Sequence, residues 1–335
     1  MTLFRSIFGG GGDVRGRYRK TFLQAAIERA VDGTDSRLRL LPGYRKRLLE
    51  PVVTAIDHVV ALVDDLPPPL TATRRNYSDE PRLAAVFASA ESMLQELGRD
   101  KALRGFLAGP GRGATRVTAL VLAEREEHHI LGRDLVDGMM RRDVPQVTVN
   151  FTGHRLFDPG PAEVEVRRHL KRRAFDHLLT LALARIGANQ VERADLVHQR
   201  DLLRNKLATL QRGGWTFKRP QEPVPDQRVL RHELEQINHQ LHTVGTDDRV
   251  LQVHLDIVAE VLGDARRQVW GRDISLHLDS MNIERHPRDP SARRIILREL
   301  RNARGRSAVA LLLTIVPTDL PPREDFLTAA ERYFY

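Results

Sequence analysis

The chain of 335 residues is 41% hydrophobic and 29% charged, the composition of a globular protein that can bury a large core. It has no cysteine, which excludes disulfides, thiolate nucleophiles and zinc–thiolate sites, and we expect a cytoplasmic location. The longest apolar run, residues 308–316, is too short to span a membrane. The net charge is +9, but arginines are spread along the chain among Asp and Glu, so the charge alone does not indicate a nucleic-acid surface.

Residues 1–12 form an apolar segment on a glycine tether. Leu3 and Ile7, and likewise Phe4 and Phe8, are spaced four residues apart, and four glycines follow. We expect this hook to be separable from the fold and to contact a partner protein or a membrane surface. The alternative is that its side chains fill a groove on the same molecule.

Residues 13–108 are predicted to form a helical domain. Apolar residues recur there at intervals of three and four, and prolines end the second helix. Asp100 is a predicted N-cap. The predicted helices cover residues 13–31, 41–66, 81–87, 89–97 and 101–107.

The pattern then changes to alternation, and residues 109–160 are predicted to form a first β meander. Its strands are expected over residues 117–124, 135–140 and 146–152, and residues 126–131 are expected either to extend the first strand or to form a second one. The glycine-rich stretch 109–115 before it is no phosphate loop, because no Gly-Lys-Ser/Thr ends it and it leads into a strand.

Residues 161–265 are predicted to form a long helical hairpin with its tip at residues 213–225. Heptad-spaced apolar residues line both of its helices. They are Leu196, Leu203, Leu207 and Leu210 going out, and Leu230, Leu234, Ile237 and Leu241 coming back. We expect the two stripes to face each other as an antiparallel coiled coil.

The last region, residues 266–335, is predicted to hold a second β group and a C-terminal helix. Its strands are expected over residues 274–279, 295–300 and 308–316, the last as a fully buried central strand. The predicted fold class is therefore α+β: a helix-rich protein with one mostly antiparallel sheet, built from strands on either side of a projecting two-helix coiled coil.

The predicted tip carries the strongest interaction signal. Trp215, Phe217, Lys218 and Arg219 occupy a loop that is longer than closure of a hairpin requires. Aromatic and arginine side chains are enriched where proteins bind one another, so these four residues are predicted to contact a partner. The alternative is that Trp215 and Phe217 fold back as a cap on the helices.

Two polar groups could bear chemistry. Glu124, Glu126 and His128 would share one face of a strand as a metal-binding set, or simply form a solvated strand end. Near the second β group are three carboxylates that could pair or could be solvent-facing strand charges flanked by arginines. These are Asp279, Glu284 and Glu299.

The sequence favours a non-enzymatic interaction or scaffold protein that uses its helical arm and tip to contact a protein partner. No cofactor signature is present, and the sequence is compatible with a homo-oligomer. One alternative is a nucleic-acid-binding protein with an arginine-rich surface. Another is an enzyme whose motif is not recognised.

Overall fold

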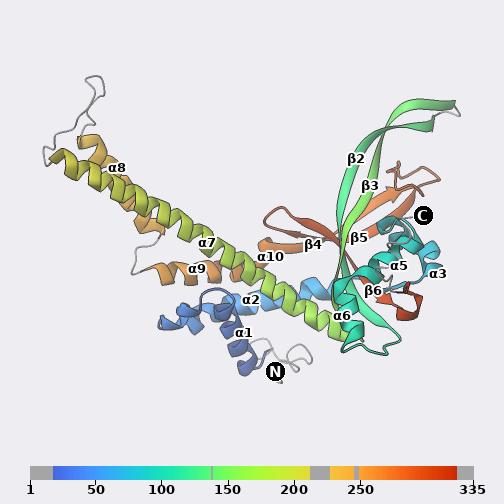
Figure 1. Cartoon of the computed structure of the whole chain (residues 1–335), viewed down its shortest axis with the longest axis horizontal. Helices are drawn as coiled ribbons and strands as arrows, with labels where there is room; N and C mark the ends of the chain where they lie inside the picture. The colour runs from blue at the N-terminus through green and yellow to red at the C-terminus, as the bar shows by residue number, and fades with distance from the viewer. Residues whose placement is uncertain (1–17, 137–138, 212–226, 245–248, 323–335) are drawn as a thin grey trace, which may run out of the picture. The chain divides into compact units, whose positions relative to one another are not determined.

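The computed structural model describes residues 18–136, 139–211, 227–244 and 249–322. It combines helices with one sheet, which confirms the α+β class (Figure 1). The hook of residues 1–12, the hairpin tip and the C-terminal helix expected after residue 322 lie outside the described residues. Within the described parts, no helix combines the length and the apolarity needed to cross a bilayer.

The chain divides into two compact units. The helical unit comprises Met1–Asp57 and Phe175–Ala265, and the sheet unit comprises His58–Ala174 and Arg266–Tyr335. Helices α2 (Tyr44–Asp64) and α7 (Glu163–Gln211) contribute residues to both units.

The helical unit buries the apolar faces of α1 (Lys20–Asp32), the 3-10 helix η2 (Ser36–Leu40) and α9 (Val250–Gly263). Arg29 on α1 donates to Asp176 on α7 through Nε at 2.6 Å. Where α1 ends, a Cβ added to Gly33 would lie 2.8 Å from Leu179, so the close approach there needs a glycine.

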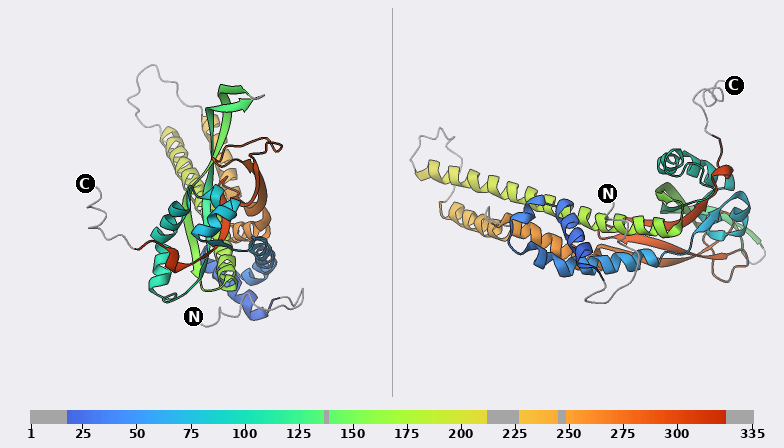
Figure 2. Two further views of the ribbon diagram at one scale, coloured as in Figure 1. Left: turned by 90° about the vertical axis from the view of Figure 1, so that its right-hand side faces the viewer. Right: turned by 90° about the horizontal axis from the view of Figure 1, so that it is seen from below.

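Helix α8 (Gln227–Val244) completes the helical hairpin, and both figures draw it alongside the second half of α7 (Figures 1 and 2). Leu207, Leu230 and Leu241 from the predicted seam are buried. The other described seam residues, Leu196, Leu203, Leu234 and Ile237, are partly buried. Two helices with apolar stripes are thus present, and the coiled-coil packing of one stripe on the other stays a prediction.

The sheet unit holds a six-stranded sheet in the order β3-β2-β6-β5-β4, with the short β1 paired in parallel to β6. The strands on this path pair antiparallel. Their bounds are β1 (Leu70–Ala72), β2 (Val117–Val136), β3 (Met139–Gly160), β4 (Val269–Leu278), β5 (Arg293–Asn302) and β6 (Ser307–Ile315). The apolar run at residues 308–316 is a central strand, as predicted, and it joins the two strand groups into one sheet.

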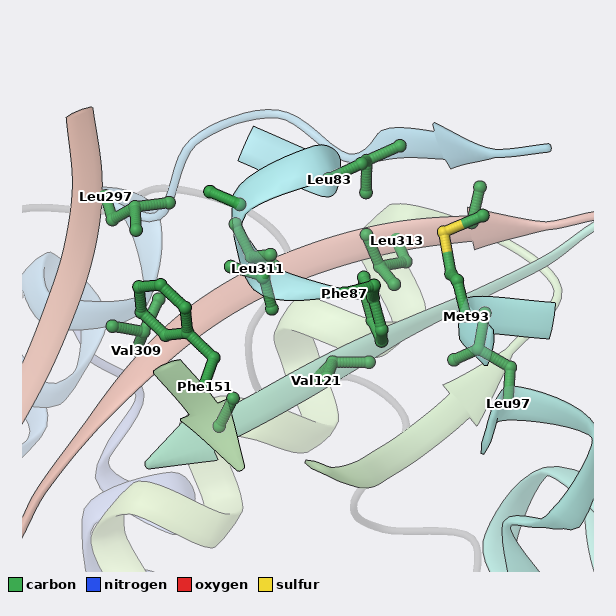
Figure 3. Packing of buried hydrophobic residues seen from close by; sticks show 14 of the residues in the cluster. Leu83, Phe87, Met93, Leu97, Val121, Phe151, Leu297, Val309, Leu311 and Leu313 are labelled. Atoms are coloured by element: carbon green, nitrogen blue, oxygen red, sulfur yellow. The ribbon is translucent and has the colours of Figure 1, made fainter. Parts of the chain in front are cut away.

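Apolar residues are buried on both faces of this sheet. One face packs on the short helices of residues 74–108, with Leu83, Phe87, Met93 and Leu97 over Val121, Leu311 and Leu313 (Figure 3). The other face packs on the end of α2 and the start of α7 through Val63, Leu66, Val166 and Leu170. Residues of β2 and β6 therefore alternate between two cores, which explains their nearly continuous hydrophobicity.

The short helices follow the sequence prediction closely, except for the first. They are α3 (Arg74–Asp79), α4 (Pro81–Val86), α5 (Ala90–Arg99) and α6 (Lys101–Ala108). The predicted N-cap is confirmed, because the Asp100 carboxylate accepts from the backbone of Ala102 at 2.7 Å and Leu103 at 3.1 Å. Strand β1 and helix α3 were missed, since each is too short to show a periodicity.

The expected meander of short strands is wrong, although residues 126–131 do extend the first strand, which was one of the two predicted alternatives. In its place are two long strands, β2 and β3, that pair along nearly their whole length with three register shifts. Pairing of β2 with β6 ends at Ala123 with Val309, and beyond that point β2 pairs with β3 alone. This two-stranded part, residues 124–152, is called the ribbon below. Residues 124–131 of β2 are exposed or partly exposed and show no apolar alternation, whereas buried Val149 and Phe151 on β3 mark the part of the ribbon that alternation predicted.

Candidate functional site

The contact residues predicted at the tip and in the hook have no described structure. Trp215, Phe217, Lys218 and Arg219 lie outside the described residues, and so do the apolar residues of the hook. The hook residues are Leu3, Phe4, Ile7 and Phe8. Their roles therefore stay predictions.

Within the ribbon, β2 pairs with β3 alone. Its base is supported by one neighbouring segment: the N–H of Val149 donates to Asn282 O at 2.9 Å, and the N–H of Glu284 donates to Val147 O at 2.8 Å. Farther out, Ile130, Leu131 and Met140 are exposed by 41%, 70% and 69%. We call these three residues the ribbon end. Single exposed apolar side chains are common on protein surfaces, and these three are candidates for contact with a partner because they lie together toward one end of the ribbon.

The predicted metal set lies on this ribbon. Glu124, Glu126 and His128 are all exposed on β2. His128 Nε2 lies 3.5 Å from Glu126 Oε2, and Glu126 accepts a 2.9 Å hydrogen bond from Thr152. Among the described residues, no three His, Asp or Glu side chains converge as metal ligands would. This geometry fits a solvated strand surface.

His154, which the sequence analysis missed, is a half-buried charged group at the junction of β3 with the short helices. Its Nε2–H donates to Val86 O at 2.9 Å, and its ring stacks on Phe87 with centroids 4.7 Å apart. Nδ1 lies 2.7 Å from Glu96 Oε2. At that distance a proton between Nδ1 and Oε2 joins the two groups, and since Nε2 donates to a carbonyl the arrangement favours the imidazolium form of the ring.

Burial opposes the charge on this ring, but the contact with Glu96 outweighs it and raises the pKa of His154. In return, the contact with His154 lowers the pKa of Glu96. The pair links α5 to β3 and is a structural tie rather than a catalytic arrangement, since a backbone carbonyl and a carboxylate occupy both ring nitrogens.

A second tie lies in the helical unit. Fully buried His254 on α9 contacts Asp35 Oδ2 through Nδ1 at 2.8 Å. Asp35 also caps η2 by accepting from the backbone N–H of Arg37 at 3.0 Å. Hydrogen bonds from the Arg37 side chain and from His254 hold the pKa of Asp35 well below its ordinary value, against the effect of burial.

An open hollow of about 640 Å³ lies between α2 and α9 in the helical unit. It is lined by polar and charged side chains, and Arg47 spans it to contact Asp256 at 3.1 Å. Glu50 and Glu260 also line it. Arg47 is already paired with Asp256, and Glu260 contacts Arg185 at 3.0 Å, so these charged groups do not converge on a reactive centre.

The three carboxylates near the second β group do not form a pair of acid and base. Asp279 contacts Arg285 at 2.9 Å and caps its own turn. Glu299 is 1% exposed, so a solvent-facing position is wrong for it. Its Oε2 lies 2.7 Å from Arg272 Nε and 3.4 Å from Arg301 Nε. The alternation with buried Ile295 and Leu297 could have placed Glu299 on the buried face.

Ion pairs also occupy many arginines elsewhere in the described chain. These pairs include Arg29–Asp176, Arg39–Asp32, Arg45–Glu28, Arg82–Glu80, Arg167–Glu163, Arg173–Asp158, Arg185–Glu260 and Arg298–Asp65. They cover both units and several elements. Much of the basic charge therefore neutralises carboxylates of the same molecule, as the sequence analysis proposed.

Comparisons with known proteins give no further assignment. No protein-family model matches the sequence, no curated protein matches it, and no solved structure matches the fold.

Proposed function

We propose that this chain is a non-enzymatic interaction protein of the cytoplasm that holds a protein partner through exposed extended elements. The observation that carries the proposal is the ribbon end. Ile130, Leu131 and Met140 lie beyond the point where the sheet supports the ribbon, and they expose apolar area that a partner would remove from water.

The second contact that we propose is the tip of the helical hairpin. Its aromatic and basic residues, Trp215, Phe217, Lys218 and Arg219, are of the types that dominate protein interfaces. The helices that carry them, α7 and α8, bury apolar residues at Leu207 and Leu230 near that end. A stable stem beneath a contact loop lowers the ordering cost of binding.

The ion pairs support a protein partner over a diffuse nucleic-acid surface. An arginine that already contacts a carboxylate adds little free positive charge to the surface. Such pairs occur in both units, for example Arg39 with Asp32 and Arg173 with Asp158. The absence of cysteine is consistent with a reducing compartment.

The proposal is tested by capture of partners on the tagged full-length chain from extracts of its own cells, with and without nuclease. The variant Leu131→Ser/Met140→Ser is expected to lose the captured protein while its melting temperature stays unchanged, because both side chains are solvated before binding. The matched control is Leu40→Ser/Met281→Ser, which removes the same two residue types where each is 75% exposed.

Retention of the partner by the ribbon-end variant, or equal loss in both variants, would contradict the role of the ribbon end. Bound material that disappears with nuclease would instead favour nucleic acid as the partner.

A further inference from the structure

One end of the sheet gathers arginines that outnumber the carboxylates beside them. It is made of α10 (Ala265–Gln268), the start of β4, the end of β5 and the turn of residues 302–306. The N–H of Ala303 donates to Gln268 O at 2.9 Å, and Trp270 on β4 pairs with Arg301 on β5. These contacts bring the four segments together within the sheet unit, and we call this region the arginine end.

The arginine end has a large excess of positive charge. Residues 266–273 and 298–306 contain seven arginines and two carboxylates. Both carboxylates are already engaged, since Asp273 contacts Arg298 at 3.1 Å and buried Glu299 contacts Arg272 and Arg301. The arginines are Arg266, Arg267, Arg272, Arg298, Arg301, Arg304 and Arg306.

Several of these guanidinium groups remain open to a ligand. Arg266, Arg304 and Arg306 are exposed, and the described residues give their side chains no carboxylate partner. Arg272 and Arg301 both turn Nε toward the single carboxylate of Glu299 and are still 46% and 39% exposed. Their terminal N–H groups can therefore donate to a further anion while Glu299 keeps them in position.

We propose that the arginine end binds single-stranded nucleic acid through its phosphates. A planar guanidinium fork matches the oxygens of a phosphate and donates two hydrogen bonds to it. Trp270 is partly exposed and lies on the same face of β4 as Arg272, whose partner on β5 is Glu299. Proteins that bind single strands combine an aromatic ring with several cations, since any base can stack on the ring.

An acidic protein segment would also meet positive charge here, but it would leave the aromatic ring without a role. The observations therefore favour nucleic acid, and an acidic polypeptide becomes an outcome of the test. This inference does not depend on the ribbon end or on the tip.

The test measures the fluorescence anisotropy of a labelled oligothymidylate of about 20 nucleotides with the full chain, at roughly 50 mM salt and above. The variant R266Q/R304Q/R306Q removes three exposed cations and keeps the Arg272–Glu299 pair. We expect its Kd to rise at least about tenfold, and the slope of log K against log salt to fall by about 2, or about 0.7 per lost phosphate contact.

The charge-matched control is R75Q/R112Q/R116Q. These arginines are also exposed, and they lie near Ala72 and Val117, whose partner Ile315 is at the other end of β6. The control is expected to raise Kd by less than about threefold, the effect of losing three positive charges that do not contact the ligand. If the first triple variant melts below the control, the single variants R304Q and R306Q replace it.

Equal weakening in the two triple variants would overturn the inference, because it would show attraction to net charge alone. The absence of saturable binding at low salt would overturn it as well. Displacement of the oligonucleotide by polyglutamate at an equal concentration of charges would assign the arginine end to acidic protein segments instead.

Discussion

Single polar residues tie the elements of this protein together, and each does so through more than one bond. Asp100 illustrates this at the start of α6. One of its carboxylate oxygens caps the helix, and the other accepts from the backbone N–H of Leu156 on β3 at 3.3 Å. The cap could be predicted from the sequence because it is local. The bond to β3 joins residues 56 apart and could not.

His154 and Glu96 lead to a prediction about pH. The raised pKa of His154 means that its contribution to stability is full below the ordinary histidine value of 6.5 and is lost as the pH rises through the folded-state pKa. The lowered pKa of Glu96 means that its contribution is full above the ordinary value of 4.5 and is lost at lower pH. The pair should therefore stabilise the fold most between about pH 4.5 and 6.5.

The variant Glu96→Gln tests this window. We expect its melting temperature to lie several degrees below that of the natural chain near pH 6 and the gap to narrow toward pH 9. Thermal unfolding followed by circular dichroism across this range measures the gap. Glu91→Gln on the same helix is the control, since Glu91 is exposed and makes only a 3.7 Å contact with Arg74. A gap that is constant with pH would show that His154 is neutral.

At the scale of elements, the strand segments that are buried were predicted better from the sequence than the exposed ones. Residues 117–123 of β2 alternate between two cores, and this stretch was identified as a strand from its sequence. Residues 124–131 of β2 are exposed or partly exposed, so nothing selected these residues for one face or the other, and the ribbon was predicted as separate short strands.

The helical hairpin gives a prediction at this scale. Leu241 on α8 is 7% exposed, and Leu241→Asp is expected to destabilise the helical unit by about 2–4 kcal/mol because it buries a charge. The neighbouring Gln240 is exposed, so Gln240→Asp is the control and should change stability by less than about 0.5 kcal/mol. Urea unfolding measures both. Equal effects would mean that α8 packs on nothing along this face.

For the whole molecule, composition and pattern were enough to predict one sheet built from two distant strand groups. The apolar run of β6 made that assembly necessary, since only a strand with neighbours on both sides buries so many apolar residues. The long ribbon, the buried Glu299 and the clustering at the arginine end depend on contacts distant in sequence. No local sequence pattern shows such contacts. Of the candidate surfaces, only the tip was therefore predicted from the sequence, and the others became visible in the structure.

Site-specific photo-crosslinking in living cells tests the central claim, contact with a protein partner, most directly. A photoreactive phenylalanine analogue is placed at Met140 on the ribbon end, at Phe217 in the tip, and at the exposed control position Leu40. We predict a discrete, protease-sensitive product at Met140 and Phe217 that is absent at Leu40. Products that form equally at all three positions, or that only nuclease removes, would contradict this account.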